Sequence, residues 1–228
     1  MAEPELLELY RKLGVPARPM LDFAEFWETQ AIDPAVWVST VPATGVLGVT
    51  NSTYGHRCRI QPNANETGRI ASQLAFPVSP NLWGPNTVIR KLVFEFMATV
   101  DVVANIDNGQ SILGGLCFSQ VATRAFPIPW CGFALVGDAL QTVTRDGGAE
   151  VVNTGFGETL TNINLFRILV IRGQIQFFLN GTLLPAPNPH TTNLPDDGLW
   201  INHYIDTEAG GAGGIYIYPI RLWTEDVP

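Results

Sequence analysis

Short apolar runs separated by turn residues fill the chain from Pro34 onward, and they constrain the fold more than any other feature. The clearest stretch is Leu165–Leu184. It holds a run that is apolar on both faces, then the pair Arg172-Gly173, then alternating apolar and polar residues. Asn180-Gly181 follows, and this pair favours a type I′ hairpin because both central residues of that turn need a positive φ. Runs of this length and spacing are typical of an antiparallel all-β domain.

Further strands are predicted on both sides of this hairpin. They share an alternation of apolar and polar residues, or a continuous apolar run, bounded by Gly, Pro, Asn or Asp. These strands are Lys91–Asp101, Ser111–Ser119, Trp130–Val136, Leu140–Arg145, Leu199–Ile205 and Gly214–Trp223.

Size and composition permit a large apolar core. The chain has 228 residues, of which 46% are hydrophobic and 15% charged. A chain of this size buries enough surface to fold without disulfides, and its charge is too low for a disordered protein. The three cysteines, an odd number, cannot form a closed disulfide framework. We expect reduced, mostly buried thiols at Cys58, Cys117 and Cys131, with a Cys117–Cys131 bridge as the alternative.

The N-terminal segment has a different pattern. From Pro4 to Leu13 the spacing predicts one amphipathic helix, and a second helical turn is predicted over Phe23–Thr29. The first helix is too short to be stable alone in water. We therefore predict an arm over residues 1–33 that packs on the β-domain of residues 34–228 or on a neighbouring subunit. Its apolar stripe consists of Leu6, Leu9, Tyr10 and Leu13.

The order of strands and turns resembles a known family. The segment Phe166–Gly181, with its Arg172-Gly173 and Asn180-Gly181 turns and a late strand that ends the domain, is similar to the core of the concanavalin A-like lectin and glucanase jelly roll. The resemblance covers roughly residues 90–225 and extends to domains of phage structural proteins. It implies an all-β, antiparallel β-sandwich of jelly-roll type, preceded here by a short N-terminal helical arm.

The glucanases of this family imply a test for catalysis. They place two glutamates around an aspartate at alternate positions of one strand, because a nucleophile and an acid must flank one glycosidic bond. Asp206 and Glu208 have part of this spacing, but His203 and Tyr204 stand where the other glutamate is expected. We therefore expect no catalytic residues and no enzyme activity.

Other kinds of chemical site have little support in the sequence. Three scattered histidines argue against zinc, and His56 with Cys58 lacks an evident third group for nucleophilic catalysis. We expect neither a metal nor a cofactor. Calcium is the alternative, with oxygen ligands from Asp101, Asp107, Asp196 and Asp197.

Aromatic residues on the last two strands give the best candidate for recognition. Trp200, Asn202 and Tyr204 alternate on one strand, and Tyr216 and Tyr218 alternate on the next. If the two strands pair, these five side chains form one face. Flat rings beside an amide suit a sugar, and the same composition also suits a face that is covered by the N-terminal helix or by another subunit.

The main functional expectation is a non-catalytic structural protein of a virion. We expect a homo-oligomer or contacts with other virion proteins, in a capsid, neck or tail assembled in the host cytoplasm. The alternatives are a carbohydrate-binding module or receptor-binding head, which would take a glycan, and a glycoside hydrolase or lyase with an unrecognised site.

Charge and hydropathy exclude several partners. The net charge of −8 and the lack of a Lys/Arg cluster argue against nucleic acid. No stretch approaches the roughly 20 apolar residues of a membrane span. The acidic start, Met1-Ala2-Glu3-Pro4-Glu5, does not resemble a secretion signal.

Overall fold

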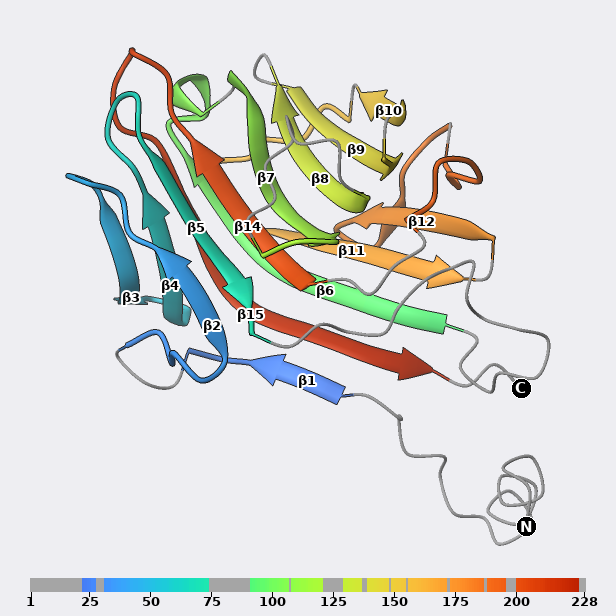
Figure 1. Cartoon of the computed structure of the whole chain (residues 1–228), viewed down its shortest axis with the longest axis horizontal. Helices are drawn as coiled ribbons and strands as arrows, with labels where there is room; N and C mark the ends of the chain where they lie inside the picture. Colours follow the sequence, from blue (N-terminus) through green and yellow to red (C-terminus); the bar gives the residue numbers. More distant parts are fainter. Residues whose placement is uncertain are drawn as a thin grey trace, which may run out of the picture.

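The protein is a sandwich of two antiparallel β-sheets. The computed structural model describes residues 22–27, 31–73, 91–106, 108–120, 129–136, 139–147, 149–154, 156–171, 173–186, 188–195 and 200–225. In these ranges the strands form an eight-stranded sheet, sheet A, and a seven-stranded sheet, sheet B. Figure 1 shows the two sheets stacked on each other, with β5, β14, β7, β8 and β9 side by side in one layer.

Sheet A contains the strands of the predicted hairpin. In spatial order its strands are β13 (Thr182–Leu183), β12 (Gln174–Leu179), β11 (Asn164–Ile171), β6 (Lys91–Asp101), β15 (Gly214–Glu225), β4 (Gly55–Gln61) and β3 (Val46–Ser52), and β1 (Asp22–Glu25) also pairs with β15. The β12–β13 turn has φ values of 52° at Asn180 and 80° at Gly181, both positive as the type I′ prediction requires.

Sheet B is formed by strands from both halves of the chain. In spatial order its strands are β10 (Ala149–Thr154), β9 (Ala139–Asp146), β8 (Trp130–Val136), β7 (Asn108–Cys117), β14 (Trp200–Asp206), β5 (Thr67–Ser72) and β2 (Trp37–Thr40). A short 3-10 helix, η1 (Val103–Asn105), follows β6. No helix in the described ranges is long and apolar enough to cross a membrane.

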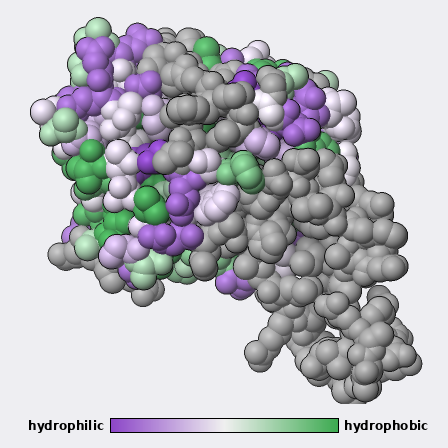
Figure 2. Space-filling model, in the orientation of Figure 1, coloured by the Kyte–Doolittle hydropathy of each residue, from purple (hydrophilic) through white to green (hydrophobic). Residues whose placement is uncertain are grey.

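One hydrophobic core fills the space between the sheets. Phe94 and Phe96 of β6 contact His203 of β14, and Phe96 stacks on Phe166 of β11 with ring centroids 4.9 Å apart. Phe177 of β12 is fully buried in the same core, as its alternation with polar residues predicts. Figure 2 shows the outside, where hydrophobic and hydrophilic residues are interspersed over the coloured part of the face.

The segment that leads into the sandwich differs from its prediction. Residues 22–25 form the strand β1, which pairs with β15 from Asp22↔Trp223 to Glu25↔Ile220, so the helical turn predicted over Phe23–Thr29 is wrong. The free edge of β15 offers backbone partners that a single helical turn cannot match. Trp27 is buried beyond this strand, and its Nε1 donates to the Tyr218 carbonyl at 2.9 Å. At least these residues of the range 1–33 therefore belong to the sandwich, while Leu6, Leu9, Tyr10 and Leu13 lie outside the described residues.

Candidate functional site

The two aromatic strands near the end of the chain do not form one face. β14 lies in sheet B between β7 and β5, whereas β15 lies in sheet A between β6 and β4. Trp200, Asn202 and Tyr204 lie on the outer face of sheet B, and Tyr216 lies on the outer face of sheet A. The prediction of a single platform is wrong because β14 and β15, although consecutive in sequence, cross from one sheet to the other. Whether either set binds a ligand stays a prediction.

Three transverse rows of side chains make up the outer face of sheet B, because residues paired across neighbouring strands point to the same side. The first row crosses five strands and consists of Trp200, Cys117, Trp130, Arg145 and Glu150. The second consists of Val38, Ala71, Asn202, Gly115, Gly132, Val143 and Val152. The third begins with Thr40, Arg69, Tyr204, Ile112, Ala134 and Gln141.

A small hydrophobic cluster on this face is separate from the main core. Ile112, Trp130 and Tyr204 belong to it, together with neighbours from β7, β8 and β9. The second row is low at its centre, because Gly115 and Gly132 bring no side chain between the larger residues of the other rows. The centre of this face is buried, and its partly exposed side chains, which include Arg69, Arg145 and Trp200, lie toward its margins.

Arg69 and Tyr204 form a directly opposed pair on β5 and β14. Burial raises the pKa of Tyr204 to about 12; the Asp206 carboxylate adds to this rise, while Arg69 and a hydrogen bond with Thr67 oppose it. Its hydroxyl therefore carries its proton at neutral pH. Burial lowers the pKa of Arg69, but an arginine keeps its charge at neutral pH.

The Arg69 guanidinium has spare donors. Its Nη2 donates to the Thr40 hydroxyl at 2.8 Å, and its Nε is buried with no hydrogen-bond partner among the described residues. The side chain itself is only half-buried. A cation held this way can receive an anionic group next to the tyrosine.

Two further polar atoms on the face lack partners in the described part of the chain: Asn202 Oδ1 and Trp130 Nε1, both buried. Asn202 is fixed through its other side-chain atom, because Nδ2 donates to the Ser119 carbonyl at 3.2 Å. A buried acceptor and a buried donor without partners cost free energy. Both side chains are fully buried, so they support the face from beneath and are not exposed on it.

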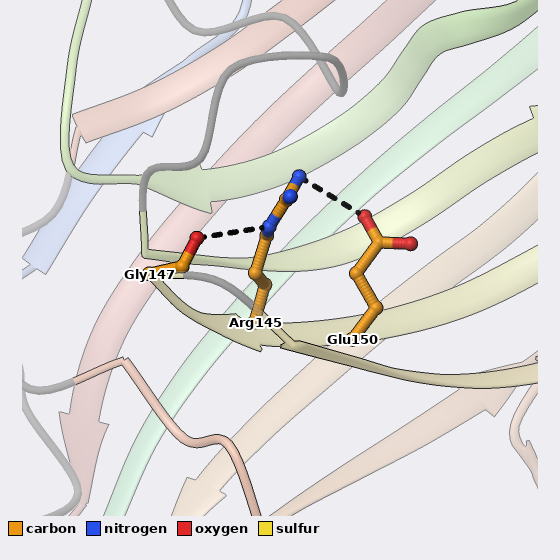
Figure 3. A network of polar contacts seen from close by, with 3 residues as sticks. All are labelled: Arg145, Gly147 and Glu150. Carbon is orange, nitrogen blue, oxygen red and sulfur yellow. Dashed lines mark hydrogen bonds and ion pairs between the residues drawn. The ribbon is translucent and has the colours of Figure 1, made fainter.

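The far end of the first row is held by an ion pair. Arg145 donates to the Glu150 carboxylate at 3.3 Å and to the Gly147 carbonyl at 3.2 Å (Figure 3). At the near end the rings of Trp200 and Phe118 meet edge to face, with centroids 6.2 Å apart. Phe118 is 40% exposed, so this end of the row is accessible to solvent.

Carboxylates do not pair across this face in the described ranges. Asp206 lies at the end of β14 opposite Thr67, Glu150 is bonded to Arg145 on β10, and Glu208 is exposed in the turn after β14. The spacing of Asp206 and Glu208 therefore does not continue along the strand. Glu95 lies on the opposite sheet and bonds to Arg167.

The histidines and cysteines do not add to the site. His203 faces the core, where burial lowers its pKa to about 4, and the His190 ring contacts Thr142 and Thr144 inside the sandwich. All three cysteines are free and buried, so the alternative Cys117–Cys131 bridge is not formed. The described residues contain no group of three or more His, Cys, Asp or Glu that could hold a metal ion.

Several solved structures have a backbone fold similar to that of this chain. A β-glucanase of Bacillus licheniformis matches 90% of this chain and 98% of its own, with a TM-score of 0.59 and 12% identity. A family 7 alginate lyase solved with substrate matches 88% and 99%, at 0.60 and 12%. A structure from the endo-acting O-glycanases that initiate mucin breakdown in the human gut microbiota matches 92% and 100%, at 0.64 and 12%. The sequence matches no protein-family model and no curated protein.

The chain therefore has the concanavalin A-like jelly-roll fold that its strand pattern resembles. The expectation of a protein without enzyme activity is contradicted by this comparison, because the three solved structures named above are a glucanase, a lyase and a glycanase. The same comparison favours the catalytic alternative over a virion component, and nothing in it supports a virion. The expected partners and location stay predictions.

Trp200, Asn202 and Tyr204 were predicted from the sequence, whereas Arg69 and Trp130, which lie on the same face, were not. Arg69 stands between Gly68 and Ile70, and its outward alternation was visible in the sequence. Its neighbour across the sheet was not, because β5 and β14 are more than 100 residues apart in the chain.

Proposed function

We propose that this protein is a polysaccharide lyase that cleaves an acidic, uronate-containing glycan on the outer face of sheet B. The observation that carries the proposal is the opposed pair of Tyr204 and Arg69, whose half-buried guanidinium has spare donors. A cation beside a neutral hydroxyl suits a sugar that bears a carboxylate. They do not supply the two carboxylates that hydrolysis requires.

Arg69 would bind the uronate carboxylate. A guanidinium is suited to this because its fork of N–H donors matches the two oxygens of a carboxylate. Neutralising that charge makes the proton on C5 of the sugar more acidic, because the negative charge that develops when the proton leaves is stabilised in place.

Tyr204 and Asp206 would then divide the proton transfers. They lie two residues apart on β14, so both side chains point to the same side of the strand. Asp206 accepts the C5 proton, the C–H electrons form the C4=C5 double bond, and the C4–O4 bond breaks. Tyr204, protonated because its pKa is raised to about 12, gives its proton to the leaving O4.

The first row would hold the sugars on either side of the cleaved bond. Trp200, which is half-buried, and Phe118, which is 40% exposed, offer ring faces for the C–H surfaces of pyranose rings. The alginate lyase with the same fold was solved with a bound oligosaccharide substrate, which supports this choice of substrate class.

The test is to incubate the purified chain with alginate, hyaluronan, polygalacturonate and neutral lichenan. A lyase yields new reducing ends and an equal amount of an ultraviolet-absorbing unsaturated sugar. Tyr204→Phe and Arg69→Gln should each lower kcat/KM at least about 100-fold, as expected for loss of an acid or of charge stabilisation.

Tyr54→Phe is the matched control, because it removes the same hydroxyl from an exposed side chain in the turn between β3 and β4 of the opposite sheet and should leave the rate unchanged. Reducing ends without unsaturated product would mean that the protein is a hydrolase. No unsaturated product from any of the acidic polymers would also contradict the proposal.

A further inference from the structure

Two arginines on the outer face of sheet A differ from the other arginines of that sheet. Arg167 bonds to Glu95, and Arg221 bonds to Asp22 at 3.2 Å. Arg57 and Arg59, both on β4, have no carboxylate partner among the described residues. Because they are two positions apart, they lie on the same side of the strand, roughly 7 Å apart along it.

The Arg57 guanidinium is held in a fixed orientation by two tyrosines. Its Cζ lies 3.9 Å from the centroid of the Tyr216 ring, a distance at which stacking is strong. Its Nη1 donates to the Tyr218 hydroxyl at 3.1 Å. The plane of the guanidinium is therefore set before any ligand arrives.

Arg59 lies against the same ring, with its Cζ 5.7 Å from the Tyr216 centroid. It donates to the Gln61 side chain. Each guanidinium has five N–H donors, and one on each has an acceptor in the described part of the chain. The Nε atoms of both arginines and the hydroxyl of Thr50, which lies opposite Arg57 on β3, are buried without a partner there.

The positive charges of Arg57 and Arg59 beside one ring repel each other, and an anion bound between them would offset this repulsion. The arrangement is also open, because Arg57, Arg59 and Tyr216 are only half-buried. A local cationic site of this kind attracts small anions, while the net charge of −8 on the chain as a whole repels acidic proteins. Its unused donors point to a ligand that accepts several hydrogen bonds.

We propose that Arg57, Arg59, Tyr216 and Thr50 form a binding site for an oxyanion, the carboxylate or sulfate group of an acidic glycan. Forked N–H donors bind such groups in pairs of hydrogen bonds. The site is on sheet A, so it lies on the opposite side of the sandwich from Arg69 and Tyr204 on sheet B. It would hold a polymer chain at a second place without taking part in cleavage.

Isothermal titration calorimetry of the whole chain tests this site with three probes. They are inorganic sulfate, an oligouronate and a neutral glucan oligomer of equal length. We expect saturable binding of sulfate or of the oligouronate, and none of the neutral oligomer at this site. Sulfate binding would mean that a free oxyanion is sufficient; binding of the oligouronate alone would mean that the site needs the sugar as well.

The double variant Arg57→Gln/Arg59→Gln should weaken this binding at least about tenfold, the usual effect of losing hydrogen bonds to a charged group. Arg221→Gln is the matched control, since it removes a charge from the same sheet and should leave the affinity unchanged. Tyr204→Phe should also leave it unchanged, which separates this site from the proposed lyase site. Melting temperatures show whether each variant is folded.

The number of oligouronate molecules bound per chain distinguishes binding on sheet A from binding at the proposed lyase site on sheet B. A fall of one bound oligomer per chain in the double variant supports the proposal. Binding of neither anion, or anion binding that the double variant keeps in full, overturns it. Arg57→Lys/Arg59→Lys keeps both charges without the forks, and it should bind more weakly than the wild type.

Discussion

At the scale of single residues, glycines fix how closely the sheets pack. Gly114 on β7 faces the core, where an added Cβ would lie 2.3 Å from the Phe96 ring. Phe96 cannot move aside easily because it stacks on Phe166 and meets Phe133 edge to face. Gly114→Ala should therefore lower the free energy of unfolding by about 1–3 kcal/mol, the usual cost of overpacking.

Gly48 on β3 is the control for this change. A Cβ there would meet nothing within 4 Å, so Gly48→Ala should change stability little or raise it slightly. Urea denaturation of both variants makes the comparison. Equal stability of the two alanine variants would show that Phe96 has room that this structure does not provide.

The buried histidines predict how stability depends on pH. Burial lowers the pKa of His203 and of His190 to about 4 each, from an unfolded value near 6.5. A neutral histidine in the folded state adds stability above pH ~6.5, and this stability is lost as the pH falls toward 4 because the unfolded chain binds the protons. Each histidine should contribute up to about 1.4 kcal/mol per pH unit in that window.

His203 is the clearer of the two for an experiment. Its Nδ1 lies within hydrogen-bond distance of the Leu113 carbonyl, and the contact requires a proton on that nitrogen. In His203→Leu the slope of unfolding free energy between pH 6.5 and 4.5 should be shallower than in the wild type. Denaturation at several pH values measures this slope, and an unchanged slope would mean that His203 is not held neutral.

At the scale of elements, the β11–β12–β13 region tests packing and backbone conformation separately. Phe177→Ala removes a fully buried ring that contacts Phe133 and His190, and it should cost about 3–5 kcal/mol. Gly181→Val forces a branched residue into φ = 80° with open space around it, and it should cost roughly 1 kcal/mol or more. Thermal unfolding of both variants checks the two values, and a larger loss for Gly181→Val than for Phe177→Ala would reverse the explanation.

Much of this region was predictable because its signals are local. The alternation of apolar and polar residues predicts the burial of Phe177, and the Asn-Gly pair predicts the turn. Neither prediction needs the rest of the chain. The candidate site depends instead on which strands become neighbours. β14 lies between β5 and β7, and no local signal distinguishes that arrangement from pairing with β15. Tyr204 was therefore found, while its partner Arg69 was not.

β1 shows the same limit at the start of the sandwich. Its few residues have no strong strand pattern, and their structure comes from the open edge of β15. Glu25 then accepts hydrogen bonds from the Trp27 backbone at 2.7 Å and from Trp37 Nε1 at 3.0 Å. Tertiary contacts, not local propensity, decide the conformation here.

At the scale of the whole molecule, the two outer faces are independent surfaces on one core. The main cluster includes residues of both sheets, from Phe96 and Phe177 to Ile201, so the sandwich should unfold as one cooperative unit. The Arg69 and Arg57 faces have that core between them. Substitutions on one face should therefore add to those on the other without coupling.

Two deletions at the N-terminus separate the predicted arm from the sandwich. Removing residues 1–27 takes away β1 and the buried ring of Trp27, which also donates to the Tyr218 carbonyl. The loss of that ring alone should cost about 3–5 kcal/mol, so this variant should melt far below the wild type.

Removing residues 1–21 keeps β1 and takes away the part of the predicted arm that carries the apolar stripe of Leu6, Leu9, Tyr10 and Leu13. If the stripe packs on the sandwich, the melting temperature should fall, by less than in the longer deletion. If it packs on a second copy, the mass in solution should fall instead, because an arm that is too short to fold alone is ordered by its partner. Calorimetry and light scattering of the two deletions measure both quantities, and an unchanged melting temperature and mass after the shorter deletion would show that the arm packs on neither.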